Sequence, residues 1–151
     1  MIPEAFLARM STLPGLDFSA FYKALEAPPV RALRVNPVKT DEKTLLPLLP
    51  FATEPLTFLP GAFLAGADKV GALPAHHAGM FYMQDPSAIS AVAAVPLKAG
   101  IRAIDLCAAP GGKTTQIAAA IGESGVLVAN EYVSARCRIL QGNVERLGLS
   151  N

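Results

Sequence analysis

The segment from Asp105 to Thr115 reads Asp-Leu-Cys-Ala-Ala-Pro-Gly-Gly-Lys-Thr-Thr and has the residue types of a ligand-binding turn. It follows an apolar run, residues 102–106, that predicts a buried strand, and it leads into residues 113–121, which predict a helix. A strand that turns tightly into a helix presents free backbone N–H groups and the positive end of the helix dipole. The segment therefore predicts a cofactor pocket.

Three kinds of nucleotide-type ligand compete for such a turn. A phosphate-binding P-loop requires Gly-x4-Gly-Lys-Ser/Thr, but Cys107 stands where its first glycine belongs. The dinucleotide fingerprint Gly-x-Gly-x-x-Gly is not supplied by Ala109, Gly111 and Gly112, so a nicotinamide-dependent oxidoreductase is a weaker alternative. S-adenosylmethionine is the third ligand, because it carries a ribose, an ammonium group and a carboxylate but no phosphate.

Charged residues around the turn bear on this choice. A cation at the position of Lys113 interacts unfavourably with the helix dipole, at a cost of roughly 0.3–1 kcal/mol. This cost indicates that Lys113 binds an anion such as the methionine carboxylate. The alternative for Lys113 is an exposed side chain on the surface. Glu131 stands 19 residues after Gly112, a spacing that suits an acid bound to ribose hydroxyls in S-adenosylmethionine and equally in NAD. Asp105 is placed to help hold the ammonium group.

The elements that must position this turn follow from periodicity and from proline and glycine punctuation. Helices are predicted at 3–10, 17–27, 41–49, 86–95, 113–121 and 134–147, and strands at 31–36, 101–106 and 125–130. Residues 50–75, which are rich in proline and glycine, predict short strands and loops. The alternating order of the second half predicts parallel strands with right-handed crossovers. We expect a domain boundary near residue 75.

Composition limits the class of protein. The 151 residues are 52% apolar and 17% charged, which predicts a globular chain of roughly one domain. No apolar run approaches the roughly 18 residues of a membrane helix, and the N-terminus does not resemble a signal peptide. Two cysteines make neither a metal cluster nor a disulfide framework. We expect a cytoplasmic protein without a metal, and the sequence predicts no oligomeric state.

Net charge does not predict a nucleic-acid partner. The chain carries a formal charge of +1, with seven basic and seven acidic residues in 1–75 and six and five in 76–151. Any RNA contact must therefore come from a local patch. Arg31, Arg34 and Lys39 predict such a patch, because no acidic residue falls within 31–39. An ordinary solvated strand face is the alternative.

Four segments of the chain match one known family in order. Residues 105–115 resemble its cofactor motif, and 31–39 resemble the basic strand of its N-terminal RNA-recognition-like region. Residues 79–87 resemble the segment before the motif, and 130–151 resemble the strand and helix after it. The family is the Sun-type, or nucleolar-protein-type, RNA cytosine-5 methyltransferases. The resemblance covers nearly the whole chain and is to the bacterial branch acting on small-subunit ribosomal RNA.

This resemblance implies an α/β fold with two parts. A small N-terminal RNA-recognition-like α/β domain, 1–75, would precede the first part of a Rossmann-like S-adenosylmethionine-dependent methyltransferase sheet, 76–151. It also implies that S-adenosylmethionine is the cofactor and that RNA, in particular ribosomal RNA, is the substrate. The cofactor-binding residues carried over from the family are Cys107, Ala108, Ala109, Pro110, Gly111, Gly112, Lys113 and Glu131.

The family's reaction uses one cysteine thiolate to attack C6 of cytosine and a second cysteine to assist release. Both cysteines belong to later strands, so we expect them beyond Asn151 and expect no methyl transfer by residues 1–151 alone. Cys107 is not predicted as the nucleophile, because it lies in the cofactor motif. The alternative function is a non-catalytic module that binds cofactor and RNA.

Several other residues have predicted structural roles. We expect Cys107 to be a small apolar wall residue and Cys137 to lie in the core on the apolar face of the last helix. His76 and His77 predict a surface loop rather than a metal site, because no cysteine or carboxylate cluster lies nearby in the sequence. The aromatic residues at 18, 21 and 22 predict core packing rather than a base-stacking platform.

Overall fold

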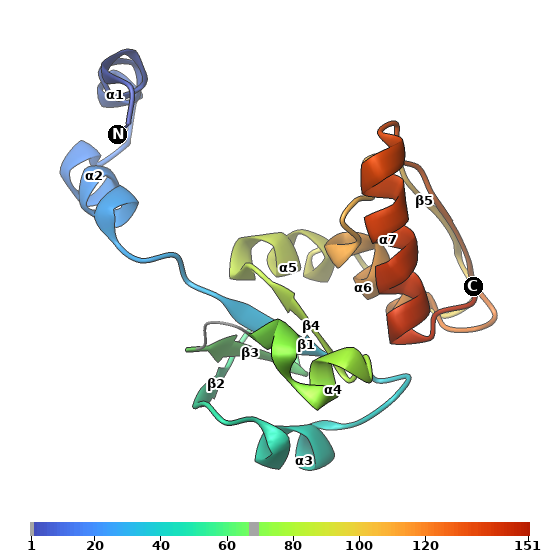
Figure 1. Cartoon of the computed structure of the whole chain (residues 1–151). Coiled ribbons are helices and arrows are strands. Elements are labelled where there is room, and N and C mark those ends of the chain that lie inside the picture. The colour runs from blue at the N-terminus through green and yellow to red at the C-terminus, as the bar shows by residue number, and fades with distance from the viewer. Residues whose placement is uncertain (1, 67–69) are drawn as a thin grey trace.

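The computed structural model describes residues 2–66 and 70–151, and within them it contains two sheets (Figure 1). The first is antiparallel, with strand order β2-β3-β1-β4, and the second is the parallel pair β5-β6. The strands are β1 (Ala32–Val35), β2 (Thr53–Pro55), β3 (Ala62–Ala65), β4 (Phe81–Gln84), β5 (Arg102–Asp105) and β6 (Val126–Ala129). The α/β fold class predicted from the sequence is confirmed.

Most of the helices cover these sheets or connect their strands, whereas the first two lie outside the body that the sheets form (Figure 1). They are α1 (Glu4–Ser11), α2 (Phe18–Glu26), α3 (Glu42–Leu45), α4 (Pro74–His77), α5 (Pro86–Ala93), α6 (Gly112–Ile121) and α7 (Ser134–Leu147), with two 3-10 turns, η1 (Leu46–Leu48) and η2 (Val70–Ala72). The Asp17 carboxylate accepts a hydrogen bond from the Ala20 N–H at 3.0 Å, which confirms it as the N-cap of α2. Gly148 ends α7 with a φ of 70°, as its position predicted.

The antiparallel sheet is covered on both faces. Leu33 and Val35 of β1 pack with Leu45 of α3 in one core cluster, whereas Ala32 packs with Ile89 of α5 in another. All four residues of β1 are therefore buried, although the alternation of its sequence predicts a half-buried strand. The predicted short strands within 50–75 are confirmed as β2 and β3, and residues 67–69 of that segment lie outside the described residues.

Strand β4 lies beyond the boundary predicted near residue 75, yet it belongs to the antiparallel sheet. It pairs with β1 in the register Ala32↔Gln84 to Val35↔Phe81. The sequence did not predict this strand, because only four residues separate the turn at 79–80 from the Asp85-Pro86 start of α5. The antiparallel sheet therefore extends to Gln84.

The parallel pair is open on one face. Ile104 is 61% exposed and Val128 is 56% exposed, so the prediction that residues 102–106 form a buried strand is wrong. Helix α6 packs along β6, and within the described chain no element covers the opposite face of this pair. The parallel pairing itself is confirmed in the register Arg102↔Val126 to Asp105↔Ala129.

Helices α1 and α2 form an arm that projects from the body of the protein (Figure 1). None of their residues, all of which the structure describes, is buried. Phe18 and Phe21 pack against each other and Tyr22 is 39% exposed, so the prediction that these aromatic residues belong to the core is wrong. Phe21 instead connects the two helices through its contact with Phe6 of α1, with ring centroids 6.2 Å apart. No helix in the described residues has the length and apolar character needed to span a membrane.

Gly79 allows α7 to pack closely on the turn before β4. Its φ is 72°, and a Cβ atom there would overlap the backbone carbonyl of Arg146. We predict that Gly79→Ala lowers the free energy of unfolding by about 3 kcal/mol or more, because left-handed strain of roughly 1–2 kcal/mol adds to overpacking. Chemical denaturation measures the change.

Gly15→Ala is the matched control. Gly15 has a similar φ of 77°, but nothing lies within 4 Å of the added Cβ. Gly15→Ala should lower the free energy of unfolding by about 1 kcal/mol, since only the left-handed strain contributes. Equal losses for the two variants would contradict the close approach of α7 at Gly79.

Candidate functional site

The turn between β5 and α6 is held by side chains of its own ends. Asp105 Oδ1 accepts from the Cys107 N–H at 3.2 Å, and the Thr114 hydroxyl donates to Asp105 Oδ2 at 2.7 Å. Gly111 precedes α6 with a φ of 114°, a conformation that favours glycine. The peptide bond between Ala109 and Pro110 is cis. The Asp105 carboxylate thus supports the turn itself.

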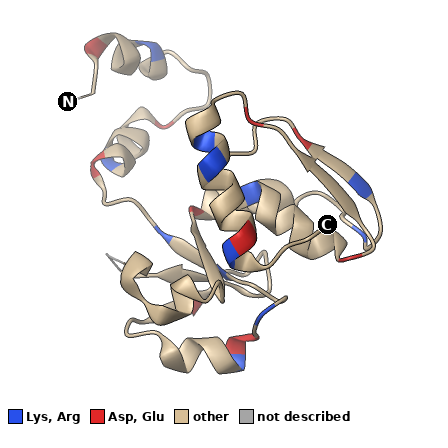
Figure 2. Cartoon of the chain, turned by 45° about the vertical axis from the view of Figure 1, so that its right-hand side comes forward, with Lys and Arg blue, Asp and Glu red and all other residues tan. Residues whose placement is uncertain are grey.

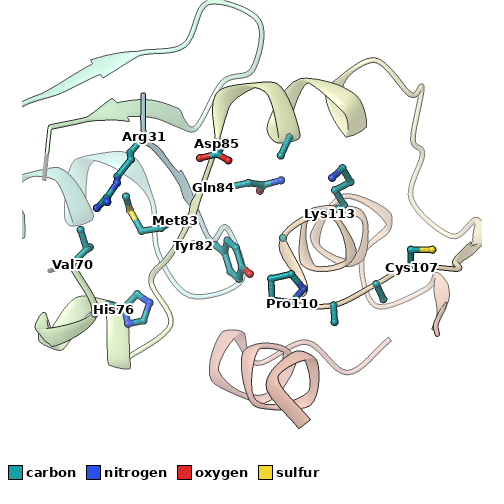
Figure 3. Close-up of a pocket in the computed structure, with 15 residues that line it drawn as sticks. Arg31, Val70, His76, Tyr82, Met83, Gln84, Asp85, Cys107, Pro110 and Lys113 are labelled. Carbon is teal, nitrogen blue, oxygen red and sulfur yellow. The ribbon is translucent and has the colours of Figure 1, made fainter. Parts of the chain in front are cut away.

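A cavity of about 660 Å³ lies between this turn and the antiparallel sheet (Figure 3). We call it the turn cavity. One wall is the turn with the start of α6, and the other is β4 with the start of α5. Six of the eight predicted cofactor-binding residues line it: Cys107, Ala108, Ala109, Pro110, Gly112 and Lys113.

The other two predicted residues lie behind the turn. Gly111 is buried, and a Cβ atom there would lie 3.2 Å from Leu140 Cδ1 of α7. Glu131 Oε2 lies 3.2 Å from Arg136 Nη1, and Arg136 Nη2 donates to the Ala109 carbonyl at 2.7 Å. Glu131 is therefore connected to the turn through Arg136 and is not among the residues that line the turn cavity.

The wall opposite the turn contains residues that sequence reasoning did not single out. Tyr82, Gln84 and Asp85 line the turn cavity, and Gln84 extends toward α6 (Figure 3). Both amide atoms of Gln84 are buried without a hydrogen-bond partner among the described residues. A Cβ atom on Gly112 would lie 3.3 Å from Gln84 Cδ, so Gly112 is needed for this approach. The available signal was the pair Gln84-Asp85 directly before the helix-initiating Pro86.

The predicted RNA patch does not form as one surface. Arg34 is 6% exposed, because it lies on the face of β1 that α6 covers, and its Nη2 donates to Thr115 Oγ1 at 2.9 Å. The prediction that Arg34 belongs to a solvent-facing patch is therefore wrong. Arg31 and Lys39 are exposed, but they lie beyond opposite ends of β1. Arg31 lines the turn cavity.

The two cysteines are free thiols, and both are exposed. Cys107 lines the turn cavity, in agreement with a wall position. The prediction that Cys137 lies in the core is wrong. The apolar face of α7 is buried at Leu140 and Leu147. Cys137 lies in the first turn of α7, and this end of the helix extends beyond the elements that cover the rest.

His76 and His77 form the last residues of helix α4, so the prediction of a surface loop is wrong. The His76 ring packs against Phe81 with a centroid distance of 5.6 Å, and burial, with lesser contributions from Arg146 and His77, lowers the pKa of His76. Among the described residues no group of three or more His, Cys, Asp or Glu side chains has the arrangement of a metal site. His76 therefore acts as a neutral packing residue.

Comparison with known proteins identifies the family. The N-terminal domain of 16S rRNA methyltransferase RsmF matches residues 2–86, which is more than half of the chain. The chain belongs to the RsmF family. A second family, 16S rRNA methyltransferase RsmB/F, matches residues 92–151, which include the turn and Glu131.

The similarity to curated members of the RsmF family extends over nearly the whole chain. The ribosomal RNA small subunit methyltransferase F of Klebsiella pneumoniae (strain 342) is 38% identical over 161 aligned positions, and that of Enterobacter sp. (strain 638) is 37% identical. Each alignment covers 99% of this chain and 34% of the relative. The chain thus spans about a third of the length of the curated relatives it matches.

Solved structures share this fold. A methyltransferase homologue from Pyrococcus horikoshii is 28% identical, with a TM-score of 0.86, over 99% of this chain and 51% of that chain. NSun6 from Pyrococcus horikoshii has a TM-score of 0.90 at 18% identity, over 99% of this chain and 64% of that chain. The arrangement of the arm, the antiparallel sheet and the parallel pair is therefore a property of the fold.

The lowered pKa of His76 predicts that stability falls in mild acid. Below about pH 6.5 an unfolded histidine binds a proton that the folded His76 resists, so acidification favours the unfolded state. In His76→Phe the drop in Tm between about pH 7.5 and 5.5 should be smaller than in the wild type, since the aromatic contact remains and the titrating group is gone. The exposed His77, changed to Phe, is the control, and an unchanged drop in His76→Phe would contradict the assignment.

Proposed function

We propose that this chain contributes the cofactor pocket and an RNA-positioning domain to a cytoplasmic, S-adenosylmethionine-dependent RNA methyltransferase that modifies C5 of cytosine in small-subunit ribosomal RNA. The observation that carries the proposal is the turn cavity, whose walls are the glycine turn and the Tyr82–Asp85 segment. Membership of the RsmF family supports the choice of rRNA as the substrate. The resemblance of the turn to the Sun-type cofactor motif supports the choice of cytosine C5.

The residues of the turn cavity suit S-adenosylmethionine, which when bound supplies an electrophilic methyl group on a sulfonium. The N–H groups at the start of α6 and the exposed Lys113 ammonium favour a carboxylate. The unpartnered amide of Gln84 offers one donor group and one acceptor to a polar ligand. Glu131 Oε1 accepts from the Val133 N–H at 3.0 Å and Oε2 faces Arg136, and each carboxylate oxygen keeps a further lone pair that can accept from a ribose hydroxyl.

Neither cysteine of this chain is assigned the attack on cytosine. Cys107 lies in the turn that binds the cofactor, and Cys137 is not among the residues lining the turn cavity. The thiolate that activates cytosine is therefore proposed to come from elsewhere in the intact protein. The domain boundary is proposed to follow Gln84, because the RNA-recognition-like sheet includes β4.

RNA is proposed to contact local basic side chains rather than a broad basic face. Figure 2 shows Lys and Arg distributed over both halves of the chain and interspersed with Asp and Glu. The exposed Arg31 lies at the turn cavity, and the exposed Lys39 follows β1, with its stem against Gly148. Both positions, one beyond each end of β1, suit phosphate contacts that orient an RNA strand beside the antiparallel sheet.

Isothermal titration of S-adenosylmethionine into the intact protein tests the pocket. Lys113→Ala and Glu131→Ala should each weaken binding by about 10-fold or more, since charged hydrogen bonds contribute about 1.5–3 kcal/mol. Lys98→Ala, which removes an exposed lysine from the turn before β5, is the control and should bind like the wild type. NADH should not compete. Unchanged affinity in both variants would refute the pocket assignment.

Salt dependence of RNA binding tests the proposed phosphate contacts. Lys39→Ala should weaken binding to small-subunit rRNA fragments uniformly across sequences and reduce the slope of log K against log salt by about one. Lys43→Ala, on the exposed side of α3, should leave the slope unchanged. A slope in Lys39→Ala equal to that of the wild type would exclude Lys39 as a phosphate contact.

A further inference from the structure

Arg34 carries a buried charge directly behind the turn. Its guanidinium extends from β1 to the first turn of α6, where Nη2 lies 2.9 Å from Thr115 Oγ1 and 3.4 Å from the Gly112 carbonyl oxygen. Both acceptors are neutral, and among the described residues Arg34 forms no ion pair with a carboxylate. Burial lowers the pKa of Arg34 to about 10, so the group remains a cation at neutral pH.

The hydrogen bond to Gly112 acts on the peptide unit that faces the turn cavity. In a trans peptide the C=O and the following N–H point in opposite directions, so the Lys113 N–H points away from Arg34. This N–H is one of the first in α6, which have no partner inside the helix. Both Gly112 and Lys113 line the turn cavity. A cation bound to the carbonyl fixes the orientation of this peptide and polarises its N–H as a donor.

The charges around the turn also point to an anion. Arg34, the dipole of α6 and Lys113 place three sources of positive potential at the same helix start. The acids that face this region are Asp105, whose carboxylate is bound to Thr114 and the Cys107 N–H, and Asp85 on the opposite wall. Neither acid is within hydrogen-bonding distance of Arg34, whose charge therefore has no direct counter-ion in the described part of the chain.

A purely structural connection at this position would not need a cation. Asn36, two residues further along the chain, joins the antiparallel sheet to α7 with a neutral amide, which donates to the carbonyls of Gly79 and Leu147, both at 2.8 Å. The Arg34 Nε atom is also buried and has no hydrogen-bond partner in residues 2–66 and 70–151. A buried cation with an unsatisfied donor destabilises the fold unless another interaction compensates. The compensation is available from a ligand on the other side of the peptide.

We propose that Arg34 is a positioning residue, which acts through the Gly112–Lys113 peptide to orient and strengthen the site for an anionic group at the start of α6. On the proposed function, on which this inference rests, that group is the carboxylate of S-adenosylmethionine. Arg34 thereby gives the antiparallel sheet a direct effect on cofactor binding.

Binding of two cofactors that differ only in this group tests the inference. S-adenosylmethionine and its decarboxylated analogue are titrated into the intact protein and its variants. Arg34→Met should weaken the binding of S-adenosylmethionine by about 10-fold and the binding of the analogue by less than about twofold. The affinity of Arg34→Lys for S-adenosylmethionine should lie between those of the wild type and Arg34→Met. Thr115→Val, which removes the closer acceptor of Arg34, should weaken the binding of S-adenosylmethionine only. Combined with Arg34→Met, it should cause no further loss of affinity.

Asn36→Ala is the matched control. It removes a buried hydrogen-bonding side chain directly after β1 without touching the turn between β5 and α6, so any effect on affinity should be equal for the two ligands. Equal weakening of both ligands by Arg34→Met would overturn the inference, and so would unchanged binding of S-adenosylmethionine. If Arg34→Met does not fold, the same comparison is decided by Arg34→Lys and Thr115→Val. Failure of the wild type to bind S-adenosylmethionine would instead refute the proposed function.

Discussion

Side chains that donate to backbone carbonyl groups join the antiparallel sheet to the helices of the parallel pair. Arg34 reaches the start of α6, Asn36 reaches the end of α7, and Arg146 of α7 returns to the carbonyls of His76 and Phe81. These bonds are buried or half-buried, where an unsatisfied polar group would be costly. The relative position of the two sheets, and with it the shape of the turn cavity, depends on them.

The turn cavity lies at this junction, so its two walls belong to different sheets. The turn supplies backbone groups and Lys113, and β4 supplies Tyr82 and Gln84. A displacement of α6 relative to β4 would open or close the space between them, since Gly112 packs directly against Gln84. The proposed cofactor site is therefore an interface as well as a turn, and its affinity depends on contacts far away in the sequence.

Local features of the sequence were sufficient to predict the elements around the turn. The apolar segments of β5 and β6 and the glycine and proline boundaries of α5, α6 and α7 act over a few residues, and each of these elements was predicted within a few residues of its ends. Six predicted cofactor residues line one cavity because they fall within the seven positions 107–113, and a turn keeps its neighbours together.

Burial was less predictable, because it depends on contacts between distant segments. Arg34 is buried by α6, whose Thr115 is 81 residues away in the sequence, and nothing near Arg34 in the chain indicates that contact. The same reason explains the exposed Ile104, in a strand-like apolar segment, and the exposed Cys137, at helical spacing from buried leucines, because neither has a covering element in the described structure. Gln84 and Tyr82 were missed because β4 is short and its role is visible only after pairing with β1.

The acceptors at the junction are main-chain oxygens, and this affects how the family can diverge. A carbonyl is present whatever residue occupies positions 76, 81 or 147, so substitutions there leave the bonds from Arg146 and Asn36 in place. The donors have no such freedom, because only a few side chains carry the required N–H groups at that reach. Within the family, the donor residues at this junction should therefore stay the same, while the residues that supply the carbonyl acceptors can vary. Covariation between aligned positions would then give little indication that the two sheets touch.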